Sequence, residues 1–247
     1  MRIETNQKLI DRNKAWSGRM FFVTLGVIIA SFFLLNSPFF TSQAQEGAGL
    51  LISLVLPALL LPVAFLSTLF SIRLTNLWVR QPRPEKLLAD NLKGISKSLV
   101  LYNYYHFPAR HVVIAPGGVI AIVTRWQEGK YVVKGDKWSA KRSAVGRLLS
   151  AMRMDGIANP SLDAQMAAEH VDKILADINP DVPVFGVVLF NDPRVEFSAT
   201  ESTIPIMYIQ AGRFPNLREW IKGLPKAAAQ LTPEQIQRFE EKTLPRK

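Results

Sequence analysis

The residues best suited to chemistry are lysines, arginines and aromatic side chains that alternate along one segment. Between Arg125 and Arg153 the acidic residues are Glu128 and Asp136 alone. Cationic side chains can bind phosphate groups, and aromatic rings can stack on nucleic-acid bases. The segment therefore predicts a site for an anionic partner, with a solvated basic loop whose tryptophans pack into the core as the alternative. The candidate anion-binding residues are Arg125, Trp126, Lys130, Lys134, Lys137, Trp138, Lys141, Arg142 and Arg147.

Carboxylates and imidazoles show no spacing typical of a metal site. Gln165, Glu169 and Asp172 would share one face of a helix, and Asp136 follows a predicted strand. A polar face opposite an apolar stripe is the rule for amphipathic helices, and metal binding by these acids is the competing hypothesis. The three histidines lack the spacing of zinc ligands, and the chain has no cysteine. We predict no metal site and no cofactor.

Two long apolar stretches precede these residues. Charged residues are absent from Met20 to Gln45 and from Gly47 to Ile72. A helix needs about 20 apolar residues to cross the hydrocarbon core of a bilayer, so we predict transmembrane helices at residues 20–40 and 48–72. A cleaved signal peptide is the alternative for the first stretch, because residues 42–44 loosely fit a cleavage site. The length of the run and the second stretch behind it favour membrane helices.

The distribution of charge indicates an orientation and a class of partner. Basic residues flank both stretches, whereas the loop between them carries one charge, on Glu46. Because positive residues stay on the cytoplasmic side, we predict a two-pass protein of the cell (inner) membrane with both termini in the cytoplasm. The net charge is +10; subtracting the five basic and three acidic residues before position 71 from 30 and 20 leaves 25 and 17, or +8. This balance favours nucleic acid or acidic lipid as the partner.

Helix and strand patterns alternate after the second stretch. Residues 184–190 form an uninterrupted apolar run, typical of a central strand, and residues 160–178 have an apolar stripe at helical spacing. Their order predicts an α/β domain with a mixed sheet and helices on its faces. We predict helices at residues 85–93, 160–178, 216–222 and 233–244, strands at 98–107, 111–115, 119–125, 130–134, 184–190 and 204–210, and a loop at 139–159.

The expected organisation has seven parts in sequence order. They are a cytoplasmic segment (1–19), a transmembrane helix (20–40), an external loop (41–47), a second transmembrane helix (48–72), a basic linker with a short helix (73–93), a cytoplasmic domain (94–223) and a polar C-terminal helix and tail (224–247).

Motifs within residues 94–223 resemble the NERD (nuclease-related domain) family. They are HVVIAPGGV at 111–119, GDKW at 135–138 and NPSLDAQ at 159–165, the last ending in Gln165. The resemblance implies a restriction-endonuclease-like αβββαβ core with a mixed sheet. It also implies a nuclease site, with an aspartate just before the first motif and a Glu-x-Lys at the end of the next strand.

Here the sequence departs from the family at the positions that would carry the chemistry. Arg110 takes the place of the aspartate, and Val123-Thr124-Arg125 takes the place of Glu-x-Lys. A hydrolytic Mg²⁺ ion needs oxygen ligands and activates water. Valine offers no oxygen, and arginine is too basic to transfer a proton near neutral pH. We therefore predict no catalytic residue and no enzymatic activity.

The resulting hypothesis is a membrane-anchored, non-catalytic, nuclease-related domain that binds nucleic acid or acidic lipid at the cytoplasmic face. A structural or partner-recruiting membrane protein without nucleic-acid binding is one alternative. A divergent metal-dependent nuclease with migrated acids is the other. The sequence does not indicate an oligomeric state.

Overall fold

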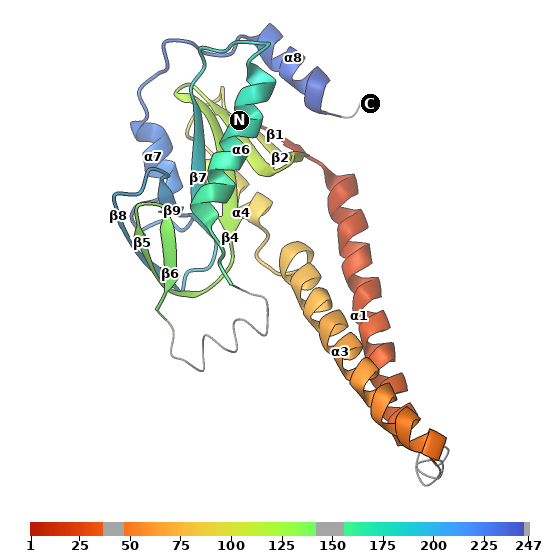
Figure 1. Cartoon of the computed structure of the whole chain (residues 1–247). Coiled ribbons are helices and arrows are strands. Elements are labelled where there is room, and N and C mark those ends of the chain that lie inside the picture. Colours follow the sequence, from red (N-terminus) through yellow and green to blue (C-terminus); the bar gives the residue numbers. More distant parts are fainter. Residues whose placement is uncertain (37–46, 142–155, 245–247) are drawn as a thin grey trace. The chain divides into compact units, whose positions relative to one another are not determined.

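The computed structural model describes residues 1–36, 47–141 and 156–244. The chain divides into two compact units (Figure 1). One unit is Lys8–Gln81, which we call the helical hairpin. The other combines Met1–Gln7 with Pro82–Lys247, and we call it the α/β domain.

The helical hairpin consists of two long apolar helices, α1 (Gln7–Leu35) and α3 (Gly47–Trp78). In the most apolar window of each, only 11% of the residues are buried, whereas the core helix of a soluble protein is mostly buried. Both helices are long and apolar enough to cross a membrane. Each extends beyond the predicted span, and residues 37–46, which include the end of the first span, lie outside the described residues.

Hydroxyl side chains line the contact between the two helices. Ser17, Thr24 and Ser31 are buried and recur every seven residues along α1. Ser17 Oγ lies 3.2 Å from Thr75 Oγ1, and Thr24 Oγ1 donates to the carbonyl oxygen of Ser67 at 3.2 Å. Small and hydroxyl side chains let apolar helices approach closely and hydrogen-bond to each other. Since the start of α1 meets the end of α3, the helices are antiparallel.

The main sheet of the α/β domain, sheet A, is mixed, as predicted. Its six strands lie in the order β1-β2-β3-β4-β7-β9. Strands β2, β3 and β4 are antiparallel, whereas β1 runs parallel to β2, and β7 and β9 run parallel to β4. The bounds are β1 (Arg2–Thr5), β2 (Val100–His106), β3 (Ala109–Ala115), β4 (Gly118–Arg125), β7 (Val184–Phe190) and β9 (Ile206–Tyr208).

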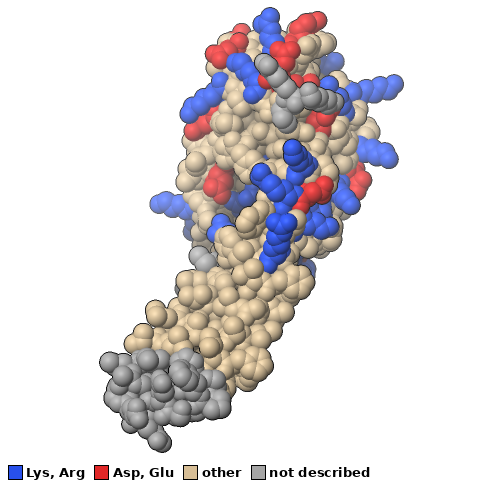
Figure 2. All heavy atoms as spheres, turned by 90° about the vertical axis from the view of Figure 1, so that its right-hand side faces the viewer, with Lys and Arg blue, Asp and Glu red and all other residues tan. Residues whose placement is uncertain are grey.

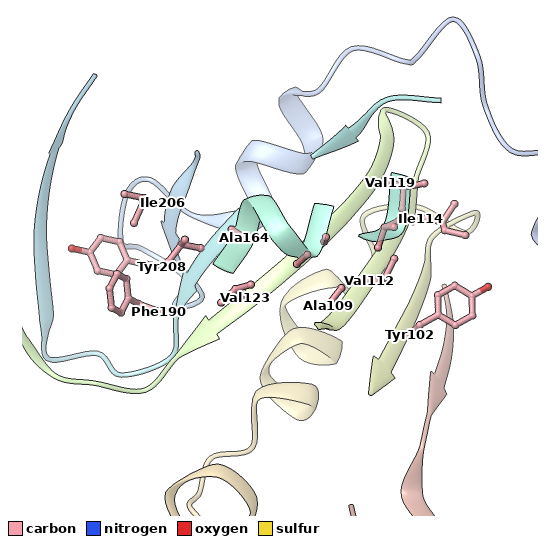
Figure 3. Packing of buried hydrophobic residues seen from close by; sticks show 14 of the residues in the cluster. Tyr102, Ala109, Val112, Ile114, Val119, Val123, Ala164, Phe190, Ile206 and Tyr208 are labelled. Carbon is pink, nitrogen blue, oxygen red and sulfur yellow. The ribbon is translucent and has the colours of Figure 1, made fainter. Parts of the chain in front are cut away.

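Helices cover both faces of sheet A. Helices α6 (Pro160–Leu175) and α8 (Pro233–Thr243) contribute to the hydrophobic cluster on one face, and α4 (Pro84–Leu92) and α7 (Leu217–Gly223) to the cluster on the other. Successive side chains of a strand point to opposite faces. Accordingly Val119, Ala121 and Val123 of β4 join the first cluster (Figure 3), and Ile120 and Ile122 join the second. The α/β class predicted from the sequence is confirmed.

A smaller sheet, sheet B, has three strands in the order β6-β5-β8. They are β5 (Gly129–Lys134), β6 (Lys137–Ala140), antiparallel to it, and β8 (Val195–Thr200), parallel to it. Buried side chains of β5 and β8 join the same hydrophobic cluster as α6. Strand β5 agrees with the prediction from the sequence, β8 was not predicted, and residues 139–159 were predicted to form a loop. Its first two residues belong to β6 instead, and residues 142–155 lie outside the described part of the chain.

Both chain segments that lead to the helical hairpin form hydrogen bonds to residues of β2 at the point where that strand is irregular. The pairing of β2 with β3 shifts between Asn103 and His106, and Tyr104 has a positive φ of 65° there. Just before α1, Thr5 Oγ1 accepts a hydrogen bond from Asn103 Nδ2 at 2.9 Å, and Asn6 Nδ2 donates to the Tyr104 carbonyl at 3.3 Å.

Arg83, in the segment between α3 and α4, forms the hydrogen bonds of the second connection. It lies in the predicted basic linker but is only 4% exposed. Its Nε donates to Glu85 Oε1 at 2.9 Å and its Nη2 to Tyr104 Oη at 3.3 Å, while Tyr104 Oη donates to Glu85 Oε2 at 3.0 Å. Arg83 is therefore part of the fold rather than a solvated cation.

Candidate anion-binding site

Four of the candidate lysines lie on one face of sheet B, which we call the lysine face. Lys134 on β5 is the register partner of Lys137 on β6. At the other end of this pair of strands, the backbone nitrogen of Lys141 donates to the carbonyl of Lys130 at 2.8 Å. All four side chains are exposed, whereas Tyr131, between them in sequence, is buried on the opposite face.

The charge of the lysine face is only slightly offset by acids. Lys130 Nζ lies 2.9 Å from Glu196 Oε2 on β8, and both side chains are exposed. Among the described residues, Lys134, Lys137 and Lys141 form no ion pair. Like charges directly opposite each other destabilise a pair of strands. Two such lysine pairs on one small sheet therefore favour a role in binding rather than in stability.

The aromatic candidates do not share this face. Trp138 points to the inner side of sheet B, where its Nε1 donates to Ser161 Oγ at 2.8 Å and its ring packs against Tyr131 and Phe190. Trp126 is half-buried beyond the end of β4. For Trp138 the structure fits the alternative of a tryptophan packed into the core. The lysine face thus offers charge for phosphate contacts, but none of its described strand residues offers an aromatic ring for stacking.

Arg125 is also separated from the lysine face. It is the last residue of β4, largely buried, and forms an ion pair with Asp163 in the first turn of α6. Burial lowers the pKa of the Arg125 guanidinium, and Asp163 acts in the opposite direction. Arg142 and Arg147 lie outside the described residues.

The three positions of the expected nuclease site lie close together. His111 pairs with Ile122, so Arg110 on β3 and Val123 on β4 are the next residues on neighbouring strands. Val123 is buried in the hydrophobic cluster of α6. The charge of Arg110 contributes to the lowered pKa of Arg125. This end of the sheet therefore presents two guanidinium groups and an alkyl side chain.

We expect the pair of Arg125 and Asp163 to stabilise the fold. Replacing Asp163 with asparagine should lower the free energy of unfolding by about 1 kcal/mol, because it leaves a buried guanidinium without a counter-charge. The effect is modest since the Asp163 side chain is 48% exposed and water screens part of it. Denaturant unfolding of the full chain in detergent, with Asp172→Asn on the same helix as the control, measures it. Equal stability of the two variants would refute the structural role.

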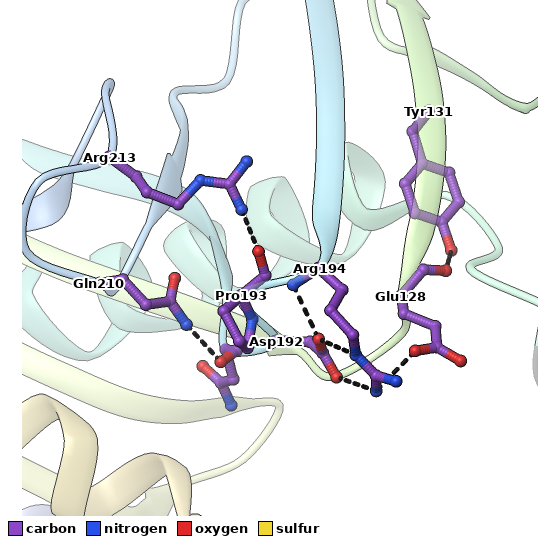
Figure 4. Close-up of polar contacts among 8 residues, drawn as sticks. Glu128, Tyr131, Asp192, Pro193, Arg194, Gln210 and Arg213 are labelled. Carbon is purple, nitrogen blue, oxygen red and sulfur yellow. Dashed lines mark hydrogen bonds and ion pairs between the residues drawn. The ribbon is translucent and has the colours of Figure 1, made fainter.

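Two acids that are not among the predicted site residues, Glu128 and Asp192, lie near the same end of the sheet, and both contact Arg194 (Figure 4). Asp192 follows β7, where the carboxyl ends of parallel strands form the usual ligand site of open α/β sheets. Its Oδ1 and Oδ2 accept from Arg194 Nε and Nη2 at 3.0 and 2.9 Å, and Glu128 forms an ion pair with the same guanidinium. An Asn-Asp pair directly after an apolar strand was the signal that could have identified Asp192.

The acids considered as alternative metal ligands either accept hydrogen bonds from neighbouring side chains or are exposed to solvent. Gln165 Nε2 donates to Glu169 Oε1 at 3.0 Å, and Asp172 is exposed on the same helix. Asp136 accepts hydrogen bonds from Thr203 at 2.6 Å and Ser202 at 3.3 Å. Over residues 1–36, 47–141 and 156–244, no group of three His, Cys, Asp or Glu side chains is placed to hold a metal ion.

No family model matches the chain, and no curated protein or solved structure is significantly similar to it. The resemblance to the NERD family therefore depends on the sequence motifs alone, and it stays a prediction.

Proposed function

We propose that this chain is a two-pass membrane protein whose cytoplasmic α/β domain binds a phosphate-bearing partner without catalysing a reaction. The single observation that carries the proposal is the lysine face. There the fold gathers Lys130, Lys134, Lys137 and Lys141 on one exposed sheet surface, and among the described residues only Lys130 has an ion-pair partner, Glu196. Nucleic acid and acidic lipid both present the phosphate groups that such a surface can bind.

The membrane location is supported by the apolar surface of the helical hairpin and by its connectivity. Basic residues gather where α1 begins and α3 ends, and Figure 2 shows no lysine or arginine along the apolar shaft facing the viewer. Since β1 pairs with β2, the chain starts in the α/β domain, leaves it through α1 and returns after α3. Two antiparallel crossings bring it back to the side on which it began, in agreement with the positive-inside rule.

The non-catalytic character is supported by the element order and by the ion pairs. Helix α4, strands β2 to β4, helix α6 and strand β7 would match the αβββαβ order of a restriction-endonuclease-like core if β5 and β6, which lie between β4 and α6, are an insertion. The metal-binding positions would then be Arg110, Val123 and Arg125. The nearby carboxylates of Asp163 and Asp192 are paired with arginines, so a divalent ion would have to displace guanidinium groups to reach oxygen ligands.

A charge-matched comparison tests the lysine face. We expect the variant with Lys130, Lys134, Lys137 and Lys141 changed to glutamine to bind a short DNA duplex at least about tenfold more weakly than the native chain at low salt. The control carries four exposed lysines from elsewhere in the domain changed to glutamine, namely Lys86, Lys93, Lys97 and Lys173. Fluorescence anisotropy of the full chain in neutral detergent provides the affinity.

The dependence on salt gives a second, independent measure. Each phosphate contact contributes about 0.9 to the slope of log affinity against log salt, so only the lysine-face variant should have a clearly shallower slope. Equal losses in both variants would assign binding to diffuse charge and not to this face. Absence of DNA binding by the native chain at low salt would exclude nucleic acid as the partner. If the chain also failed to bind vesicles of acidic lipid, the proposal would be contradicted and a structural or partner-recruiting role favoured.

A further inference from the structure

We infer that the lysine face binds the anionic head groups of the bilayer in which the same chain is embedded. This inference rests on the proposed function and selects one partner for it. The observations that carry it are the chemistry of the face, the shortness of the two connections to the helical hairpin, and the small number of charges involved.

The chemistry of the face suits a layer of head groups better than a nucleic acid. Lysine ammonium groups and the exposed hydroxyls of Ser198 and Thr200 can donate hydrogen bonds to phosphate oxygens. Base-specific reading of a duplex needs a helix, ribbon or loop that enters a groove, and binding of single strands needs exposed rings. Trp138 and Tyr131 face inward, so the described strands of sheet B present neither.

The connections hold the α/β domain near the membrane. One residue, Asn6, separates β1 from α1, and five residues, 79–83, separate α3 from α4. Five residues span at most about 18 Å when fully extended, and residues 7–19 of α1, which precede the predicted membrane span, add about 20 Å at 1.5 Å per residue. The domain therefore meets the head groups of its own bilayer at a high effective concentration, which is the condition under which weak contacts become sufficient.

The binding strength that four lysines can provide is too small for a dissolved partner but sufficient for lipid beside a tethered domain. Each basic residue close to an anionic leaflet favours the bound state about fivefold, so four favour it by a factor of about 10³. A dissolved partner held by the same factor would have a dissociation constant of only about 1 mM. For a domain already tethered at the surface, a factor of this size is ample to keep the face bound to lipid.

Lysine reactivity in nanodiscs tests this inference on the full chain. Discs of phosphatidylcholine alone are compared with discs that also contain phosphatidylglycerol, and acylation of each lysine by an activated ester is followed by mass spectrometry. We expect Lys130 and Lys141 to react at least severalfold more slowly in the acidic discs. Exposed Lys173 and Lys226 serve as internal controls, and high salt should remove the difference.

A double variant makes the result specific to the lysine face. Changing Lys134 and Lys137 to glutamate reverses half of its charge while leaving Lys130 and Lys141 as reporters, and their protection should disappear. Absence of protection in acidic discs, together with DNA binding that requires the four lysines, would overturn the lipid inference and leave the proposed function standing with nucleic acid. Absence of both would overturn both. Equal protection of the control lysines would show general adsorption and refute the assignment to this face.

Discussion

Acidification from pH 7 to pH 5 should lower the free energy of unfolding of the α/β domain by about 4 kcal/mol, because two histidines are buried in their neutral form. His106 on β2 is 2% exposed and His111 on β3 is fully buried. Burial is the main reason that the pKa of His106 falls to about 4, with the charge of His170 adding to it. Burial, followed by the charges of Arg110 and Arg83, lowers the pKa of His111 to about 3.

The sign follows from the direction of these shifts. A histidine in the unfolded chain has a pKa of about 6.5 and takes up a proton as the pH falls below that value. In the folded chain, His106 and His111 take up a proton only when the pH approaches their lowered pKa values. The stability is therefore complete above about pH 6.5 and is lost as the pH falls toward 4. Each histidine accounts for about 2 kcal/mol at pH 5, a large part of a typical domain stability of roughly 5–15 kcal/mol.

The hydrogen bonds of His106 identify which of its ring nitrogens carries no proton. The Thr243 hydroxyl donates to the carbonyl oxygen of Phe239 at 2.7 Å, so its oxygen accepts from His106 Nε2 at 3.0 Å. His106 Nδ1 is then the unprotonated nitrogen, and it has no partner among the described residues. The ring also stacks on Phe239, with 4.7 Å between the centroids. A proton on Nδ1 would place a charge in an apolar site without a counter-charge.

The number of protons taken up on unfolding can be measured directly. The slope of the unfolding free energy against pH, from denaturant titrations of the full chain in detergent between pH 7 and pH 5, should approach two protons. The variant His106→Gln keeps a hydrogen-bonding group beside Thr243 and should reduce the slope to about one proton. A slope near zero in the native chain would show that the two imidazoles are not held neutral by the fold.

Replacing Gly186 with alanine should destabilise the α/β domain by about 3 kcal/mol. Gly186 lies in the central strand β7, where α6 crosses sheet A. A Cβ atom there would lie 2.4 Å from the carbonyl oxygen of Ala164 and 2.9 Å from its carbonyl carbon. Both are backbone atoms of α6, so relief requires moving the helix and not merely turning a side chain.

The matched control is Gly223→Ala at the end of α7, where an added Cβ meets nothing within 4 Å. That variant should change the stability by less than about 0.5 kcal/mol. The denaturation midpoint of the full chain, monitored by tryptophan fluorescence, provides the comparison. Equal midpoints of the two alanine variants would show that α6 does not approach β7 closely enough to exclude a Cβ atom at residue 186.

The helices and strands that could be predicted are those in which the apolar residues recur with the spacing of the face that the fold buries. The apolar run of β7 and the stripe of α6 identified both elements, although α6 ends at Leu175 and not at residue 178. Strand β1 has four residues and half-exposed side chains, and β6 has four residues without a continuous apolar pattern. Strands of this kind form because a neighbouring strand offers hydrogen-bond partners to their backbone. Their own side chains give little indication that they form a strand.

The candidate site was predicted only in part, for the same reason. Lysines four residues apart, at 130 and 134 and at 137 and 141, could be assigned to one face once the pairing of Lys134 with Lys137 is known. Arg125 and Trp138 belong to the same basic segment, yet their side chains are held by Asp163 and Ser161. These partners lie 38 and 23 residues further along the chain. Sequence spacing within the segment does not reveal such partners.

The pairing of β1 with β2 has a consequence for how the protein is made. Residues 2–5 have no strand partner until residues 100–103 have been synthesised, so both apolar helices are available for insertion before the sheet can be completed. The terminal amine of Met1 donates to the Lys97 carbonyl at 3.1 Å. Deletion of residues 2–5 would therefore remove an edge strand from a domain whose other elements all follow residue 83.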